Sequence, residues 1–132
     1  MTMIHCRIVT PQGFYKEMDT PIINIETTDG ARGILPEHMP IVTTLKIGKM
    51  TTEEKGQREE YAVAGGLFYF RNNMAELLTD AIENKRDIDI GRAEAAKARA
   101  ERRLSATDRN YDLRRAEIAL QKALNRLNVK GQ

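Results

Sequence analysis

Four cations in the last third of the chain have the spacing of a phosphate-binding site. Arg92 and Arg99 are seven residues apart, and Lys122 and Arg126 are four apart, so each pair shares one face of a helix. Guanidinium groups bind phosphate oxygens through paired hydrogen bonds, and an ammonium adds a point charge. The spacing therefore predicts a site for a polyphosphate. A solvated basic face without a ligand fits the same spacing about equally well.

The segment that carries these cations has the composition of helices. Residues 85–130 contain no proline, Gly91 is their one glycine, and Ala, Arg, Glu and Leu dominate. Small and apolar residues recur at helical spacing in two stripes: Ala93, Ala96, Ala100 and Leu104, then Leu113, Ala116, Leu120, Ala123 (or Leu124) and Leu127. The polar stretch 105–110 separates them. This pattern predicts an antiparallel two-helix hairpin with a weakly held alanine seam, since alanine buries little area.

Antiparallel pairing would gather the cations at one end of this hairpin. With the turn centred near residue 109, Arg92 lies beside Arg126, and Lys122 lies level with Ala96. Asp89 is the nearest acid. Like charges at this distance repel each other unless an anion sits among them. The hairpin is therefore expected to be marginally stable and to close more firmly around an anion.

Residues 1–83 instead have the sequence pattern of short β-strands. Ile4, Cys6 and Ile8 alternate with polar residues, which is the period of a strand with one buried face. Further strands are predicted at 22–27, 41–47, 60–64, 67–70 and 74–78. Turns are predicted at 10–13, 28–30 and Asn72-Asn73, and Gly65-Gly66 predicts a bend or bulge. Short strands at this spacing indicate a β-sandwich or barrel.

Charge and composition divide the chain at the same place and narrow its class. Residues 1–83 have a net charge of −4 and residues 84–132 one of +6, so we expect two domains, 1–84 and 85–132. No segment has the length and apolarity of a membrane helix, and no secretory signal is visible. A lone cysteine favours a reducing, intracellular compartment. His5, His38 and Cys6 have no metal-ligand spacing, and no catalytic set is visible, so an enzyme is not expected.

Several stretches, in order, resemble the epsilon subunit of F-type rotary ATP synthases over nearly the whole chain. In the β region they are Val9-Thr10-Pro11-Gln12-Gly13, Gly33-Ile34-Leu35-Pro36-Glu37-His38-Met39-Pro40 and Ala62-Val63-Ala64-Gly65-Gly66. In the helical region they are Asp87-Ile88-Asp89-Ile90-Gly91-Arg92-Ala93, Arg115-Ala116-Glu117-Ile118-Ala119-Leu120 and Asn125-Arg126-Leu127.

The resemblance implies a ten-stranded β-sandwich followed by the helical hairpin. The β-domain would sit on the central stalk, against the gamma subunit and the membrane rotor ring (c-ring). A loop spanning 31–38 would face the ring, with contacts from Ala31, Arg32, Glu37 and His38. The hairpin would permit turnover when folded and inhibit ATP hydrolysis when extended towards the catalytic alpha/beta hexamer. The inhibitory contact with a beta subunit would be made by basic residues of opposite sign to its acidic loop: Arg102, Arg103, Arg109, Arg114 and Arg115.

The resemblance also implies that the expected polyphosphate is ATP. Ile88-Asp89-Ile90-Gly91-Arg92-Ala93 matches the Ile/Leu-Asp-x-x-Arg-Ala motif with which some bacterial members bind regulatory ATP. The implied roles are phosphate contacts for Arg92, Arg99 and Arg126, and a lining of the base for Ile88 and Ala93. Glu83 and Asp89 would make polar contacts with adenine or with the local backbone. Lys122 stands where ATP-binding members usually carry arginine. Losing the guanidinium fork is expected to weaken binding by about 1–3 kcal/mol.

No metal or redox cofactor is implied, and a role for magnesium with the ATP is left open. Two other classes remain: a free-standing nucleotide-sensing module, and a chaperone-like or nucleic-acid-binding protein that uses the basic hairpin as an arm. The scarcity of aromatic residues argues against a nucleic-acid partner. The expected location is the cytoplasmic side of a bacterial cell membrane, held there peripherally through the complex.

Overall fold

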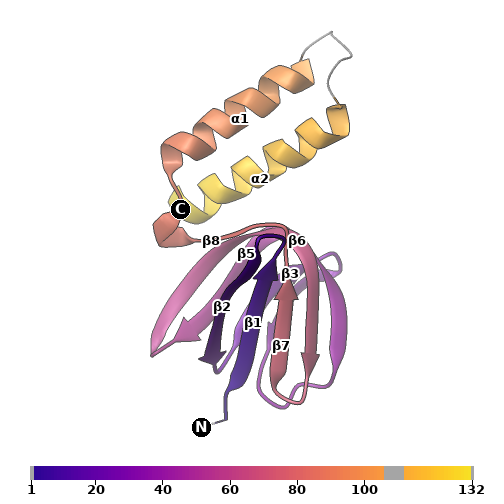
Figure 1. Cartoon of the computed structure of the whole chain (residues 1–132), viewed down its shortest axis with the longest axis vertical. Helices are drawn as coiled ribbons and strands as arrows, with labels where there is room; N and C mark the ends of the chain where they lie inside the picture. Colours follow the sequence, from indigo (N-terminus) through magenta and orange to yellow (C-terminus); the bar gives the residue numbers. More distant parts are fainter. Residues whose placement is uncertain (1, 106–111, 132) are drawn as a thin grey trace. The chain divides into compact units, whose positions relative to one another are not determined.

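The computed structural model describes residues 2–105 and 112–131 and divides the chain into two compact units, Met1–Asn84 and Lys85–Gln132 (Figure 1). The first unit is all-β and the second is helical. The strands of the first unit are β1 (Ile4–Thr10), β2 (Gly13–Thr20), β3 (Ile23–Thr27), β4 (Gly30–Ile34), β5 (Ile41–Glu54), β6 (Gln57–Arg71), β7 (Met74–Leu78) and β8 (Ile82–Asn84).

The strand order is β2-β1-β7-β6-β5-β3-β4, with β8 paired to β6 off this path. All pairings are antiparallel except that of β1 with β7. The long strands β5 and β6 curve, so that the sheet folds over on itself into an open sandwich (Figure 1). The fold class expected from the sequence is confirmed. Eight strands are described where the resemblance implied ten, because β5 and β6 each run unbroken through 14 and 15 residues.

The bend in β6 coincides with the predicted glycine pair. Before the pair, residues 61–63 bond to β8, and after it, residues 67–71 bond to β7. Gly65 and Gly66 have φ angles of 80° and 123°, which side-chain-bearing residues rarely adopt. These two residues therefore allow one continuous strand to serve both layers of the sandwich, where the sequence had suggested two separate strands.

The strand with one buried face that was predicted at the start of the chain is confirmed. Ile4, Cys6 and Ile8 are fully buried and belong to one core cluster with Phe68 and Leu77. The sequence missed β2, β4 and β8. The outward faces of β2 and β4 are charged or glycine-rich, and β8 has only three residues, so none shows a run of β-branched residues.

A group of polar side chains is packed between strands that are not hydrogen-bonded to each other. Lys16 of β2 places its Nζ 2.6 Å from Oε1 of Glu54, at the end of β5. Glu54 also accepts hydrogen bonds from the hydroxyls of Thr52 and Tyr61, each at 2.6 Å. Because β2 lies at one end of the strand order, this ion pair joins two strands that the sheet itself leaves apart.

The second unit contains a short 3-10 turn, η1 (Lys85–Asp87), and two helices, α1 (Ile90–Ser105) and α2 (Leu113–Gly131). The two helices run antiparallel, as predicted (Figure 1). Lys130, in the last turn of α2, donates from Nζ to the carbonyl oxygens of Lys85 (3.0 Å) and Arg86 (3.4 Å). This contact fastens the end of α2 to η1, which the sequence did not predict.

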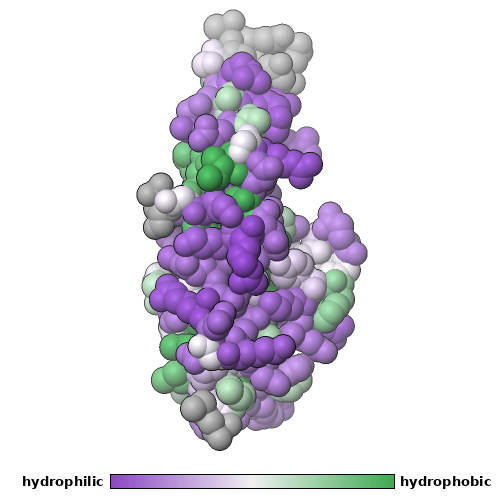
Figure 2. Space-filling view, turned by 90° about the vertical axis from the view of Figure 1, so that its left-hand side faces the viewer, coloured by the Kyte–Doolittle hydropathy of each residue, from purple (hydrophilic) through white to green (hydrophobic). Residues whose placement is uncertain are grey.

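The alanine seam is present. Ala93, Ala100, Ala116 and Ala123 are buried, and Ala123, not Leu124, is the inward residue of its pair. Leu113 was predicted to lie in the seam, and this is wrong because it is 53% exposed. Leu113 is the first residue of α2, and the buried part of the seam begins one turn later, at Ala116. Figure 2 shows a mostly hydrophilic face of the hairpin with one small hydrophobic area.

Candidate functional site

The predicted nucleotide motif forms the start of α1. Asp89 caps this helix: its Oδ1 accepts the Arg92 amide at 3.0 Å, and its carbonyl accepts the Ala93 amide, also at 3.0 Å. Of the two polar roles that the sequence left open for Asp89, the structure shows the contact with the local backbone. Arg92 is thereby placed in the first helical turn, where its side chain is exposed.

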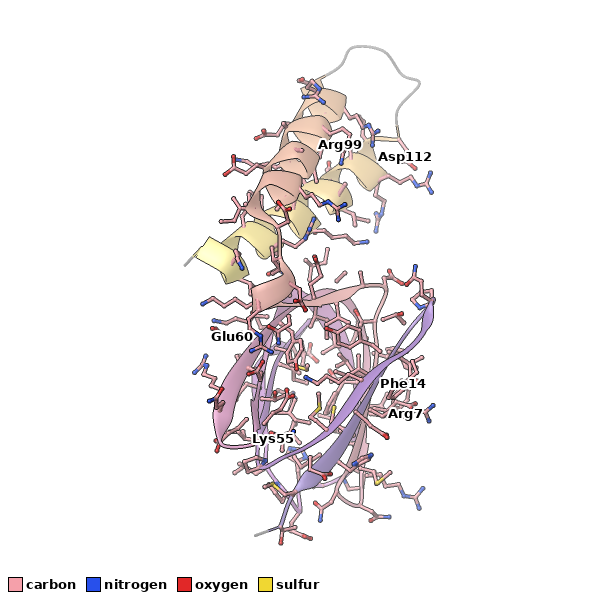
Figure 3. The ribbon with its side chains drawn as sticks, turned by 60° about the vertical axis from the view of Figure 1, so that its left-hand side comes forward. Arg7, Phe14, Lys55, Glu60, Arg99 and Asp112 are labelled. Atoms are coloured by element: carbon pink, nitrogen blue, oxygen red, sulfur yellow. The ribbon has the colours of Figure 1, made fainter. Side chains whose placement is uncertain are left out.

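Seven of the eight predicted nucleotide-site residues lie in the helical unit. Arg92 and Arg99 are exposed on α1, and Lys122 and Arg126 are half-buried on α2, where they flank the buried Ala123. Arg92 is near the beginning of α1 and Arg126 is in the second half of α2, so antiparallel packing puts both towards the same end of the hairpin. Arg99 lies further along α1 (Figure 3).

The two residues expected to line a base are not exposed. Ile88 is 3% exposed and Ala93 is fully buried. A bound base would therefore have to displace the atoms that now cover them. The eighth residue, Glu83, belongs to the β unit, where it is half-buried on β8.

The predicted inhibitory arginines gather at the other end of the hairpin. Arg102 and Arg103 are in the last turn of α1, and Arg114 and Arg115 are in the first turn of α2; all four are exposed. Asp112 caps α2 by accepting the amides of Arg114 (3.0 Å) and Arg115 (3.3 Å). Arg109 lies outside the described residues.

The predicted ring-contact segment is only partly a loop. Ala31 and Arg32 lie in strand β4, which pairs with β3. The strand continues as far as Ile34 because the side chain of Ile34 is buried in the core. The loop is therefore confined to residues 35–40. Within it Glu37 has a φ of 71°, and the His38 ring stands edge-on to Phe70 with centroids 5.8 Å apart. The Glu37 amide donates to Oδ1 of Asn73, a residue for which the sequence predicted only a place in a turn.

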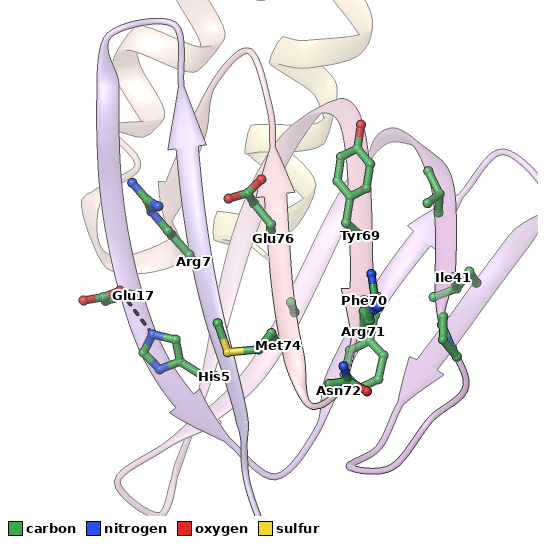
Figure 4. Close-up of a pocket in the computed structure, with 13 residues that line it drawn as sticks. His5, Arg7, Glu17, Ile41, Tyr69, Phe70, Arg71, Asn72, Met74 and Glu76 are labelled. Atoms are coloured by element: carbon green, nitrogen blue, oxygen red, sulfur yellow. Dashed lines mark hydrogen bonds and ion pairs between the residues drawn. The ribbon is translucent and has the colours of Figure 1, made fainter.

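A shallow depression of about 810 Å³ lies on the outer face of the β unit (Figure 4). Its lining mixes exposed apolar side chains with charged ones and comes from five strands. Among the lining residues are His5, Val42, Tyr69 and Met74. Exposed apolar side chains bordered by polar and charged ones occur at protein–protein contacts.

Both ring nitrogens of His5, at the rim of this depression, face carboxylates. Its Nδ1 lies 2.9 Å from Oδ1 of Asp19 and its Nε2 lies 3.1 Å from Oε2 of Glu17. Carboxylates only accept hydrogen bonds, so this geometry favours the imidazolium form, in which both ring nitrogens donate. The hydrogen bonds with Asp19 and then Glu17 accordingly raise the pKa of His5. Nearby, the Arg7 guanidinium lies 5.8 Å from the centre of the Phe14 ring (Figure 3).

Among residues 2–105 and 112–131 there is no cluster of three or more metal-ligating side chains. In the same part of the chain, no helix has the length and apolarity needed to span a membrane.

Comparison with known proteins agrees with this architecture. Residues 3–85 match the family model for the β-sandwich domain of the ATP synthase delta/epsilon chain, and residues 86–131 match the model for its long α-helix domain. The chain is 43% identical over 131 residues to the ATP synthase epsilon chain of Bacillus velezensis, covering 99% of both chains. It is 39% identical over 133 residues to that of Halalkalibacterium halodurans, covering 100% of both.

Solved structures share the fold at lower identity. A chain of the Euglena gracilis mitochondrial ATP synthase matches with a TM-score of 0.79 at 22% identity, covering 95% of this chain and 79% of that one. A chain from the central stalk and c-ring of the Tetrahymena thermophila mitochondrial enzyme matches with a TM-score of 0.62 at 14% identity, covering 98% and 97%. On the two family models and the two bacterial relatives, the chain belongs to the ATP synthase delta/epsilon chain family, as a bacterial F-type epsilon subunit.

Proposed function

We propose that this chain is a non-catalytic central-stalk subunit of a bacterial F-type ATP synthase that restrains ATP hydrolysis through its helical hairpin, and that ATP stabilises the folded, permissive hairpin. Its partners would be the gamma subunit, the c-ring and the alpha/beta hexamer. The apolar depression on the β unit suits gamma, and the loop 35–40 suits the ring. The chain would then lie peripherally on the cytoplasmic side of the cell membrane.

The observation that carries the ATP proposal is the position of Lys122 and Arg126. Both cations are half-buried beside the alanine seam, and the Nε of Arg126 is itself a buried atom. Two like charges four residues apart on one helix face repel each other. A polyphosphate bound there and by the exposed Arg92 and Arg99 would relieve this repulsion.

The resulting gain follows from mass action. A ligand that binds only the closed hairpin stabilises it by RT ln(1 + [L]/Kd), which is about 2.7 kcal/mol at a ligand concentration 100 times Kd. The seam that opposes opening is made of alanines, which bury little area. A term of this size is therefore large enough to decide whether the hairpin is open or closed. When ATP is scarce, the hairpin opens and blocks hydrolysis.

The ATP proposal predicts a specific binding defect. Calorimetric titration of the isolated protein should detect ATP binding, and Arg92→Ala or Arg126→Ala should each raise Kd at least about tenfold, the loss of a charge-assisted hydrogen bond. Arg114→Ala removes the same charge from the other end of the hairpin and should leave Kd within about twofold. Lys122→Arg should tighten binding, because it restores a guanidinium fork. No detectable heat at millimolar ATP would refute regulation by ATP and leave the family assignment intact.

The inhibitory role predicts a second, separable defect. Complexes rebuilt with Arg102→Ala and Arg103→Ala, or with Arg114→Ala and Arg115→Ala, should hydrolyse ATP at least about fivefold faster than the wild-type complex when ATP is low. Each double variant should keep normal ATP affinity in the isolated protein. Lys46→Ala combined with Arg58→Ala, which removes two exposed cations of the β unit, is the charge-matched control. Equal hydrolysis rates in all complexes would remove these four arginines from the inhibitory contact.

A further inference from the structure

The turn between β6 and β7 contains an asparagine with an additional structural role. Arg71 pairs with Met74, so the connection is the two residues Asn72 and Asn73, with φ angles of 51° and 60°. A two-residue hairpin turn of this kind needs positive φ at both positions, and asparagine is one of the few side-chain-bearing residues that tolerates it. The turn alone would be satisfied by many Asn or Gly pairs. It does not explain the contacts made by the Asn73 side chain.

Both ends of the Asn73 side-chain amide bond to one residue of the loop 35–40. Its Oδ1 accepts the backbone amide of Glu37 at 2.6 Å, and its Nδ2 donates to Oε1 of Glu37 at 2.8 Å. The backbone oxygen of Asn73 also accepts the amide of His5, at the start of β1, at 2.9 Å. Asn73 therefore joins three segments that are far apart in the sequence.

Glu37 depends on these hydrogen bonds with Asn73, because its backbone conformation is unfavourable. Glu37 has a φ of 71°, in the left-handed region that a glutamate rarely occupies. Next to it, the amide of His38 bonds to the Leu35 carbonyl at 3.1 Å, which closes a turn. Leu35 and Met39, on either side, are 56% and 73% exposed. The result is a loop of defined shape that holds two apolar side chains in solvent.

We propose that Asn73 is a positioning residue that sets the loop 35–40 in its docking conformation before it meets its partner. The identification of that partner as the rotor ring rests on the function proposed above. A loop ordered in advance loses less conformational entropy on binding, so a preset loop binds more tightly than the same loop without the clasp. Asn73 contributes to affinity through Glu37, without needing to touch the partner.

Amide hydrogen exchange on the isolated protein tests the clasp directly. Asn73→Gly keeps the positive φ and removes the side-chain amide, and it should speed exchange of the Glu37 amide at least about tenfold. Asn72→Gly, the matched control in the same turn, should leave that rate unchanged. Equal rates in Asn73→Gly and wild type would overturn the proposal.

A donor–acceptor swap separates the clasp from a general loss of stability. Asn73→Asp alone places two carboxylates face to face and should also speed exchange. Combining it with Glu37→Gln restores one donor and one acceptor between the side chains, so protection should return. A double variant that exchanges as fast as Asn73→Asp would mean that the side-chain pair does not hold the loop.

Binding to the rest of the complex tests docking. Membranes stripped of this subunit should bind Asn73→Gly about fivefold or more weakly than wild type and Asn72→Gly equally well. Faster exchange with unchanged binding would overturn the docking role of the loop. Failure of the wild-type protein itself to bind would instead refute the proposed function, so the two failures are distinguishable.

Discussion

Gly66→Ala is expected to cost the β unit about 4 kcal/mol or more of its unfolding free energy, the sum of backbone strain and overlap. A Cβ built on Gly66 overlaps the carbonyl oxygen of Leu78 and lies 2.9 Å from the Leu78 carbon and from Cα of Thr79. All of these are backbone atoms of the end of β7 and the residue after it, so they cannot move without breaking the β6–β7 pairing. The φ of 123° adds strain that no side-chain rotamer relieves.

Gly30→Ala provides a matched control for this prediction. Gly30 has a φ of 121°, almost the same as that of Gly66, but an added Cβ meets no atom within 4 Å. It should therefore cost only the backbone strain, about 1–3 kcal/mol. Urea unfolding followed by circular dichroism measures both. If Gly66→Ala is no less stable than Gly30→Ala, the close approach of β6 to β7 is not what demands glycine; if Gly66→Ala does not fold while Gly30→Ala does, the prediction stands.

The second large effect is expected at the partly buried carboxylate of Glu54. Glu54→Gln keeps the shape of the side chain but removes the charge that Lys16 and the hydroxyls of Thr52 and Tyr61 stabilise. Only 13% of the Glu54 side chain is exposed, so solvent cannot replace these bonds fully. We expect a loss of about 2–4 kcal/mol, between the values for a charged hydrogen bond and for a broken buried ion pair.

A double variant shows how much of that loss comes from leaving the Lys16 ammonium without its carboxylate partner. Lys16→Met together with Glu54→Gln should be more stable than Glu54→Gln alone, because no partly buried charge remains without its partner. Lys46→Met breaks an exposed pair with Glu26 and should cost less than about 1 kcal/mol. Equal losses in Lys46→Met and Glu54→Gln would contradict a special role for the Lys16–Glu54 pair.

Glu54 also makes the stability of the folded protein depend on pH. Burial raises the pKa of Glu54, but hydrogen bonds from Lys16, Thr52 and Tyr61 outweigh it and hold the pKa below its usual value. A carboxyl with a lowered pKa in the folded state stabilises the protein above its unfolded pKa. That stability is lost as the pH falls through the folded pKa. At acid pH, the free energy of unfolding of Glu54→Gln should therefore depend less on pH than that of wild type. Equal pH dependence in the two proteins would refute this role of Glu54.

The local elements were predictable wherever one physical signal dominated. The alternation of Ile4, Cys6 and Ile8 predicted a half-buried strand, and the alanine-rich stretch from residue 85 predicted the helices, because side-chain periodicity follows backbone geometry. The Asn72-Asn73 turn was predictable because few residues tolerate its φ angles. Edge strands such as β4 were missed because half-exposed polar strands have no comparable signal.

The candidate site divides in the same way. Sequence alone determined the residue types and helical spacing of Arg92, Arg99, Lys122 and Arg126, because charge and helical period are local properties. Which of these cations is half-buried depends on the packing of α2 against α1, and only the tertiary structure decided that. The same holds for the pairing of Asn73 with Glu37, 36 residues away, and for the collision that reserves position 66 for glycine. Contacts between distant segments depend on how the sheet folds over, and no local pattern in the sequence encodes them.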